Sequence, residues 1–342
     1  MKDCSCYQRL ALPLSILIYS VSAAWLMAED PPADARLNRR TYYENVLLVG
    51  EDEGAVLQMG GVGKFLDFTN LIPSRPMWST VDHQGRCWLS GMGGVMCLDG
   101  ENVVVYGREH GLPDLALAHV FEDSRGRIWV GSYGGGVSAF DGKNWRQMRT
   151  SDGLSDDQAN ACAEDWQGRV WIGCDKGVSI YDNNAFDRAG LTVKLQLGNV
   201  DVKSMIGDAK GRIYLGCIGG LMRVGPDLNS NIITPRDGLP QKTPQAVYID
   251  SKDRIWVGTW GGGVAMIDPV AWKVSKEHAL PEAGHVRRIV EDSNGRIWVA
   301  AIEGLWILRE ERWTKVMAIP LSMVATVPDA VARQLLDLAE KK

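Results

Sequence analysis

A Gly-Arg dipeptide returns along this chain at a nearly constant spacing. It stands at residues 85–86, 126–127, 168–169, 211–212 and 295–296, with 253–254 as an Asp-Arg variant, so the steps are 41, 42, 43, 42 and 42 residues. An upstream segment from Asn45, NVLLVGEDEGAVLQMGG, keeps the frame but lacks the turn aspartate and the arginine. A fixed period of this length indicates one structural unit written several times, because a single unit cannot bury its own faces.

Within each copy, short apolar runs separated by turn residues predict four β-strands. In one copy these are Ala118–Glu122 (strand A), the RIWVG run (strand B), Val137–Asp141 (strand C) and Trp145–Arg149 (strand D). Four strands per unit of about 42 residues is the signature of a propeller blade. Counting the degenerate copy, the sequence predicts an all-β fold, a seven-bladed β-propeller of four-stranded antiparallel blades.

The recurring residues have structural explanations. A large aromatic residue stands in strand B of six copies, where it would fill the wedge between neighbouring blades: Trp88, Trp129, Trp171, Tyr214, Trp256 and Trp298. Leu48 stands at this place in the first copy. The aspartate that precedes each glycine by three can fix the A–B turn by accepting backbone N–H bonds. The arginine column, from Arg86 to Arg296, invites an anion site, but each arginine can pair with its own turn aspartate, and we expect that local pairing.

The repeat resembles that of the two-component regulator propeller family. The segment AVYIDSKDRIWVGTWGGGV, from Ala246 to Val264, fits the pattern best, and the resemblance covers about Asn45 to Met317. Such propellers are known from extracytoplasmic sensor regions of hybrid histidine kinases, some of which bind oligosaccharides. The resemblance thus implies a sensor-like binding protein, although this chain has one set of seven repeats and no recognisable kinase.

Composition supports a large β-rich chain and excludes one class of partner. The chain has 342 residues, 45% of them hydrophobic, with 38 glycines and 13 tryptophans. Its net charge of −5 gives no basic footprint, so nucleic-acid binding is disfavoured.

The first 28 residues have the layout of a secretory signal. Lys2 and Arg9 precede an uncharged run from Leu10 to Ala28, with small residues at candidate cleavage points. The alternative is an uncleaved membrane anchor, because the run could just span a bilayer. We expect a signal peptide over 1–28, a linker over 29–41 and a periplasmic or secreted protein.

Five cysteines follow that segment: Cys87, Cys97, Cys162, Cys174 and Cys217. An odd number cannot all pair within one chain. Cys87 and Cys97 flank one predicted turn and could face each other, but we expect all five to be buried and reduced.

The ring, over residues 42–328, must join its ends. The first copy lacks a good strand A, since DARLNRRT before it is too charged. We expect the segment near 320–328, within PLSMVATVPD, to supply the missing strand. Asp329 would then cap a C-terminal helix over 329–342.

The B–C turns and D–A connections lie at one end of the blades, and sequence varies most there between copies. Binding residues of a protein usually stand on variable loops that a rigid scaffold holds in place. Candidate ligand contacts at this end come from the B–C turns and the D–A connections: Met92, Tyr133, Asp175, Trp260, Glu303, His110 and His285. Others stand near the start of strand A, where they could line the channel mouth: His119, Lys203, Gln245, Arg287 and Arg288.

Two interpretations of these residues stay open. Tyr133 and Trp260 could form a stacking platform for a sugar, or each could cover its own glycine-rich turn. The polar residues of strand A could contact a ligand, or they could hold only water.

No local catalytic motif is present: there is no Gly-x-Ser-x-Gly, His-Glu-x-x-His or P-loop. A metal held by several loops, for instance by Glu282, His285 and His110, is an alternative, because a streptogramin-inactivating lyase also uses a propeller. We expect a monomeric, exported binding protein with no cofactor, whose partner is a small molecule, a glycan or a protein. The alternatives are a metal-assisted lyase or hydrolase and a purely structural interaction module.

Overall fold

The structure is a computed structural model, and it describes ten stretches of the chain. These are residues 47–50, 54–59, 62–66, 74–99, 102–113, 116–187, 200–292, 294–309, 312–317 and 321–324. The predicted signal segment, linker and C-terminal helix lie outside the described residues.

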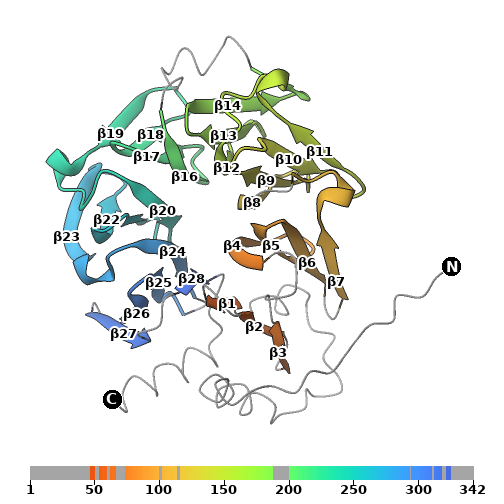
Figure 1. Ribbon diagram of the computed structural model, residues 1–342. Helices are drawn as coiled ribbons and strands as arrows, with labels where there is room; N and C mark the ends of the chain where they lie inside the picture. The colour runs from red at the N-terminus through yellow and green to blue at the C-terminus, as the bar shows by residue number, and fades with distance from the viewer. Residues whose placement is uncertain are drawn as a thin grey trace.

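Four-stranded antiparallel sheets are arranged in a ring (Figure 1). Six of them consist of four consecutive strands each, in the order A, B, C, D from the axis outward. Their A strands are β4 (Ser74–Val81), β8 (Leu117–Glu122), β12 (Ala159–Glu164), β16 (Val202–Gly207), β20 (Pro244–Ile249) and β24 (Val286–Glu291). Their B strands are β5 (Cys87–Met92), β9 (Ile128–Ser132), β13 (Val170–Cys174), β17 (Ile213–Cys217), β21 (Ile255–Thr259) and β25 (Ile297–Ala301).

The outer half of each blade is formed by strands C and D. The C strands are β6 (Gly94–Asp99), β10 (Val137–Phe140), β14 (Gly177–Asp182), β18 (Gly220–Val224), β22 (Gly263–Asp268) and β26 (Gly304–Arg309). The D strands are β7 (Asn102–Tyr106), β11 (Trp145–Met148), β15 (Ala185–Phe186), β19 (Ser230–Ile233), β23 (Lys273–Leu280) and β27 (Arg312–Met317).

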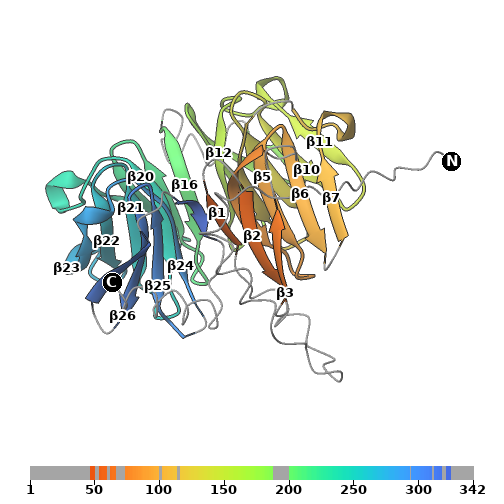
Figure 2. The ribbon, with the colours of Figure 1, turned by 60° about the horizontal axis from the view of Figure 1, so that its bottom comes forward.

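A further four-stranded sheet combines strands from both ends of the described chain. It contains β1 (Leu47–Gly50), β2 (Gly54–Met59), β3 (Val62–Leu66) and β28 (Leu321–Val324). β28 pairs antiparallel with β1, with Leu48 opposite Val324. This composite sheet lies between the β4–β7 and β24–β27 blades in both views (Figures 1 and 2), and the inner strands contact their neighbours around the whole ring.

The fold class predicted from the sequence therefore needs correction. We expected seven blades, but six are formed by four consecutive strands each. The remaining sheet is composite, and its inner strand β28 lies in the segment near 320–328 that was expected to supply the strand missing from the first copy. We also expected a short C-terminal helix. The described residues contain no α-helix, only short 3-10 turns: η2 (Arg108–His110), η3 (Thr150–Asp152), η4 (Pro235–Asp237) and η5 (Pro281–Ala283). All four turns stand in D–A connections.

A buried aspartate organises each A–B turn. Asp250 Oδ2 accepts hydrogen bonds from Arg254 Nε at 2.6 Å and from Trp256 Nε1 at 2.8 Å. Asp250 Oδ1 accepts from the backbone N–H groups of Lys252 and Arg254. The same set recurs with a tryptophan at Asp82, Asp123, Asp165 and Asp292, and with the Tyr214 hydroxyl at Asp208. The expected local pairing of the arginine column is confirmed.

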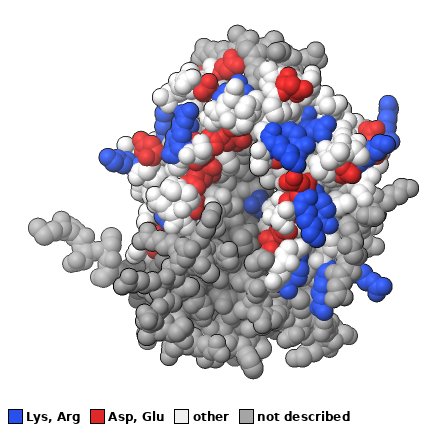
Figure 3. Space-filling view, turned by 180° about the vertical axis from the view of Figure 1, so that it is seen from behind, with Lys and Arg blue, Asp and Glu red and all other residues white. Residues whose placement is uncertain are grey.

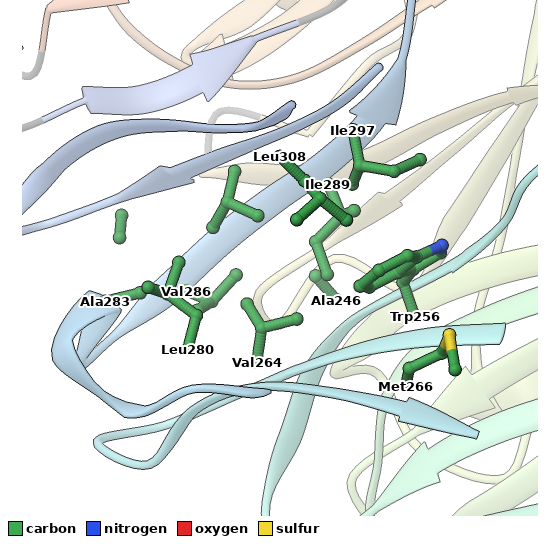
Figure 4. Packing of buried hydrophobic residues seen from close by; sticks show 12 residues of the cluster. Ala246, Trp256, Val264, Met266, Leu280, Ala283, Val286, Ile289, Ile297 and Leu308 are labelled. Carbon is green, nitrogen blue, oxygen red and sulfur yellow. The ribbon is translucent and has the colours of Figure 1, made fainter. Parts of the chain in front are cut away.

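The core lies between blades rather than inside any one of them. Five strand-B aromatics pack in clusters with apolar residues of the following blade: Trp88, Trp129, Trp171, Tyr214 and Trp256. Trp256, for example, packs with Ile289 and Ile297 in the cluster of Figure 4. The strand-B tryptophans have no exposed surface. The glycine that ends the RIWVG run permits this packing, since a Cβ at Gly258 would collide with Val286 of the next blade. The role predicted for the aromatic column is confirmed.

Glutamates at the end of strand A join neighbouring A–B turns. Glu164 accepts from the backbone N–H and the hydroxyl of Ser124, both at 2.7 Å. Glu291 binds Ser251 in the same way, and Glu122 binds the backbone N–H and the ring of His83. β16 has Gly207 at this position, and the preceding turn carries Trp166, which packs on Gly211.

All five cysteines are free and buried, as the sequence predicted. Burial raises the pKa of Cys87 to about 12 and that of Cys97 to about 12 as well, so neither is a reactive thiolate at neutral pH.

We expect Asp250→Asn to lower the free energy of unfolding by about 3 kcal/mol, because it removes a buried carboxylate from two charge-assisted bonds and leaves Arg254 without its counter-charge. Denaturant titration followed by tryptophan fluorescence measures the change.

Asp268→Asn is the matched control. Asp268 is exposed and only accepts the N–H bonds of Val270 and Ala271 in a C–D turn, so we expect a loss below about 1 kcal/mol. Equal losses in the two variants would contradict a central role for the buried aspartate.

Candidate functional site

A β-bulge at the start of the inner strands sets the geometry of the channel mouth. In β8, β12, β16, β20 and β24 the pairing with strand B shifts by one residue at this point. We call the five bulged residues the bulge ring: Ala118, Asn160, Lys203, Gln245 and Arg287. A bulge re-aims a side chain, so the same device presents a different chemical group from each blade.

The B–C turns place a second ring of side chains at the same end. This turn ring consists of Met92, Tyr133, Asp175, Ile218 and Trp260. Met92 and Tyr133 are each 43% exposed, Ile218 is 49% exposed and Trp260 is 48% exposed. Four exposed apolar side chains thus stand at equivalent B–C turns of four blades, which makes this end a candidate binding surface.

The two rings touch between adjacent blades. Lys203 Nζ lies 2.6 Å from Asp175 Oδ1 of the preceding blade, and 2.7 Å from Asp201 Oδ1. Asn160 donates to the same Asp175 oxygen at 2.8 Å. Although burial opposes it, the two carboxylates raise the pKa of Lys203, so this ammonium stays charged at neutral pH.

Tyr133 belongs to the same mouth. Burial raises the pKa of its phenol, and the charges that act on it are those of Lys203, Arg287 and Asp175. Its ring is nevertheless partly exposed, so Tyr133 presents an aromatic surface beside a set of charged groups.

A second cluster joins the β20–β23 and β24–β27 blades. The rings of Trp260 and His285 lie 4.6 Å apart between centroids, and the Arg287 guanidinium lies 5.6 Å from the Trp260 ring. Glu303 accepts the backbone N–H of His285 at 3.2 Å. Trp260 is therefore held by neighbours that leave nearly half of it exposed.

The structure brings most of the candidate residues together at this end, but not all. Gln245 is half-buried in the bulge ring, and Met92 is in the turn ring. His110 lies in η2, where it contacts Tyr106, Gly107 and Glu109 of its own outer segment. Glu282 has no described side chain. Asn160 in the bulge ring and Ile218 in the turn ring share the pattern of these rings.

His119 and Arg288 stand one residue beyond the bulge, deeper in the channel. This level also carries Trp78 on β4, whereas β12, β16 and β20 carry the small residues Ala161, Ser204 and Ala246. The Trp78 and His119 rings are 4.6 Å apart, and the Arg288 guanidinium lies 4.0 Å from the Trp78 ring. One side of the channel is therefore bulky and aromatic, and the other is lined by small side chains.

A cavity of about 740 Å³ lies beside these residues, and Trp78, His119, Ser204 and Arg288 line it. It extends along the inner strands to the A–B turns at His83 and Ser124, which is the end opposite to the turn ring. Variation between the turns pointed to the other end, since a cavity lined by inner strands leaves no mark in the sequence of the turns.

Charges around the ring are of both signs. On the face shown in Figure 3, acidic and basic side chains are intermixed around a central hollow, and Lys or Arg atoms are visible inside that hollow. No single-sign patch of the kind that binds a nucleic-acid backbone is evident on this face.

Among the described residues, no group of three or more His, Cys, Asp or Glu side chains could hold a metal ion. No helix among them is long and apolar enough to cross a membrane.

Fold and channel define the class: an all-β propeller of antiparallel four-stranded sheets with a funnel of varied side chains at one end. The model of the two component regulator propeller matches residues 111–134, 238–261 and 280–303. Each match runs from a D–A connection to a B–C turn. The chain thus carries two component regulator propeller repeats, as its sequence predicted.

Solved structures share this fold at low identity. The extracellular domain of a putative hybrid two component system from B. thetaiotaomicron aligns with a TM-score of 0.65 and 20% identity, over 78% of this chain and 37% of that one. A catalytically inactive virginiamycin B lyase from Staphylococcus aureus, with quinupristin, aligns at 0.58 and 10% identity, over 80% and 88%. PorZ, a surface component of the type-IX secretion system of Porphyromonas gingivalis, aligns at 0.53 and 16%, over 76% and 46%.

At these identities the likeness shows the fold alone. The extracellular domain of a putative one component system from B. thetaiotaomicron also aligns, with a TM-score of 0.58 and 16% identity. This chain spans 37% of the two component chain and 41% of the one component chain, well under two thirds of their length. No curated protein matches the sequence.

We expect His119 to make the protein sensitive to acid. It is 5% exposed, and burial, together with Arg288, lowers its pKa to about 3 from an ordinary 6.5. Between these values the unfolded chain binds a proton that the folded chain does not, so the free energy of unfolding falls as the pH decreases.

His119→Gln removes this contribution and keeps an acceptor for the Cys162 N–H, which His119 Nδ1 accepts at 3.3 Å. Urea titrations at pH 7 and pH 5 compare the two proteins, and we expect the wild type to lose about 2 kcal/mol more than the variant. Equal losses would show that His119 does not cause the acid sensitivity.

Proposed function

We propose that this chain is an exported, sensor-like propeller that binds a small ligand, a carbohydrate, at the channel mouth formed by the bulge ring and the turn ring. The observation that carries the proposal is the repeated pairing of a bulged residue with a B–C turn residue. Two such pairs join adjacent blades, Lys203 with Asp175 and Arg287 with Trp260, and they differ in chemistry.

The chemistry of the mouth suits a sugar. Tyr133 and Trp260 offer partly exposed aromatic faces, on which the C–H face of a sugar ring can stack. Asp175, Lys203 and Arg287 beside them supply acceptors and donors for hydroxyl groups. Sites of this kind combine apolar surface with a few placed polar groups.

The extracellular location of two structural relatives supports export of this chain. Two sensor-type relatives are extracellular domains, and the apolar segment over residues 10–28 has the composition of a signal peptide. The ring would then act outside the cytoplasm as a receptor for a ligand, with a protein partner reading its occupancy.

We expect Trp260→Ala and Tyr133→Ala each to weaken sugar binding by about fivefold to tenfold, because each removes one stacking face. A thermal-shift screen with neutral and acidic mono- to tetrasaccharides identifies a probe, and calorimetric titration measures its Kd for each variant.

Trp166→Ala is the matched control. Trp166 is also exposed, at 42%, but it stands in an A–B turn at the opposite end of the ring. We expect its Kd to stay within about twofold of the wild type. An unchanged Kd in both mouth variants, or a loss in Trp166→Ala alone, would refute binding at the mouth.

A further inference from the structure

The cavity at the A–B end holds a guanidinium that has no counter-charge among the described residues. Arg288 extends from β24 over the Trp78 ring. Its Nε atom is buried and has no hydrogen-bond partner, and none of the ion pairs between described residues involves it. The side chain as a whole is half-buried. A partly desolvated cation without an anion is costly, and such a group in a cavity is suited to bind one.

The acidic residues that line the same cavity are already engaged. Asp123 holds Arg127 and Trp129, Glu122 binds His83, and Glu164 binds Ser124. These carboxylates therefore belong to the frame of the A–B turns. Burial lowers the pKa of Arg288 to about 10, which is still well above neutral pH. The guanidinium therefore stays protonated at neutral pH, and the inner channel carries a positive charge.

His119 supplies a hydrogen-bond donor to the same cavity. Its Nδ1 accepts the Cys162 N–H, and the ring is neutral at pH 7, so its proton stands on Nε2. Tyr248 lines the cavity near Arg288 and contributes a hydroxyl. Arg288, His119 and Tyr248 thus provide donors from three inner strands, and Thr80, Arg125 and Ser204 line the cavity as well.

Apolar side chains form much of the remaining lining. Val120, Met205, Ile206 and Val247 line the cavity from three inner strands, β8, β16 and β20. The cavity volume of about 740 Å³ is in the range of small-molecule sites. A ligand that uses both the guanidinium and these apolar residues has an anionic group at one end and an apolar body at the other.

We propose that this cavity is a second binding site, which takes a small organic carboxylate whose carboxylate group pairs with Arg288 and whose apolar body packs on the β16 and β20 wall. The carboxylate geometry matches the planar donor fork of arginine. The site is separate from the channel mouth: Arg287, the preceding residue, is the bulged one and lies beside Trp260, whereas Arg288 lies beside Trp78.

The probe is 4-fluorophenylacetate, and its neutral amide, 4-fluorophenylacetamide, is the matched control ligand. Fluorine NMR line broadening on the full chain measures the Kd of each. We expect the carboxylate to bind about tenfold or more tightly than the amide, because only the carboxylate pairs with the guanidinium. Equal binding of acid and amide, or no binding of the acid at about 10 mM, would overturn the proposal.

The adjacent arginines provide matched variants. We expect Arg288→Gln to weaken binding of the acid by about tenfold or more, and Arg287→Gln to leave it within about twofold. Arg288→Lys, which keeps the charge but loses the fork, is expected to fall between them, and it serves as the test if the glutamine variant does not fold. Loss in Arg287→Gln with retention in Arg288→Gln would move the site to the mouth and refute this one.

Discussion

One buried carboxylate, repeated in every described A–B turn, is the contact on which the rest of the ring depends. Its two oxygens hold the backbone of the turn, an arginine from the next strand and the indole or phenol that fills the space between blades. Local turn geometry and inter-blade packing are therefore set by the same side chain. Because the aromatic ring is oriented by its polar atom, its apolar face meets the following blade in a fixed position.

This arrangement explains which parts of the fold the sequence could predict. Residues such as Asp250, Arg254 and Trp256 recur with the period because each blade needs all three. The strands, their order within a blade and the local arginine pairing could therefore be predicted from the sequence. The composite sheet breaks the period, because its strands come from segments of weak similarity. Its closing strand was nevertheless placed near 320–328 from the sequence, since the first copy lacks a strand A and the ring must join its ends; β28 at Leu321–Val324 pairs with β1.

Only part of the candidate site could be predicted from the sequence. Turn residues such as Tyr133 and Trp260 stand out because they depart from the repeat. The bulges that raise Lys203 and Arg287 into the mouth have no residue signature, since the extra residue differs in every blade. The cavity beyond Trp78 was missed for another reason: its lining comes from several inner strands that meet only in the closed ring.

The pairing of β28 with β1 has a consequence for how such a chain tolerates its own repetition. A linear stack of repeats leaves a hydrophobic face at each end and needs two polar capping units to stay in solution. Here the first and last strands of the described chain share one sheet, so each end covers the other and neither exposed face remains. The number of units is thereby fixed, since an added or deleted blade would leave the two ends unable to meet.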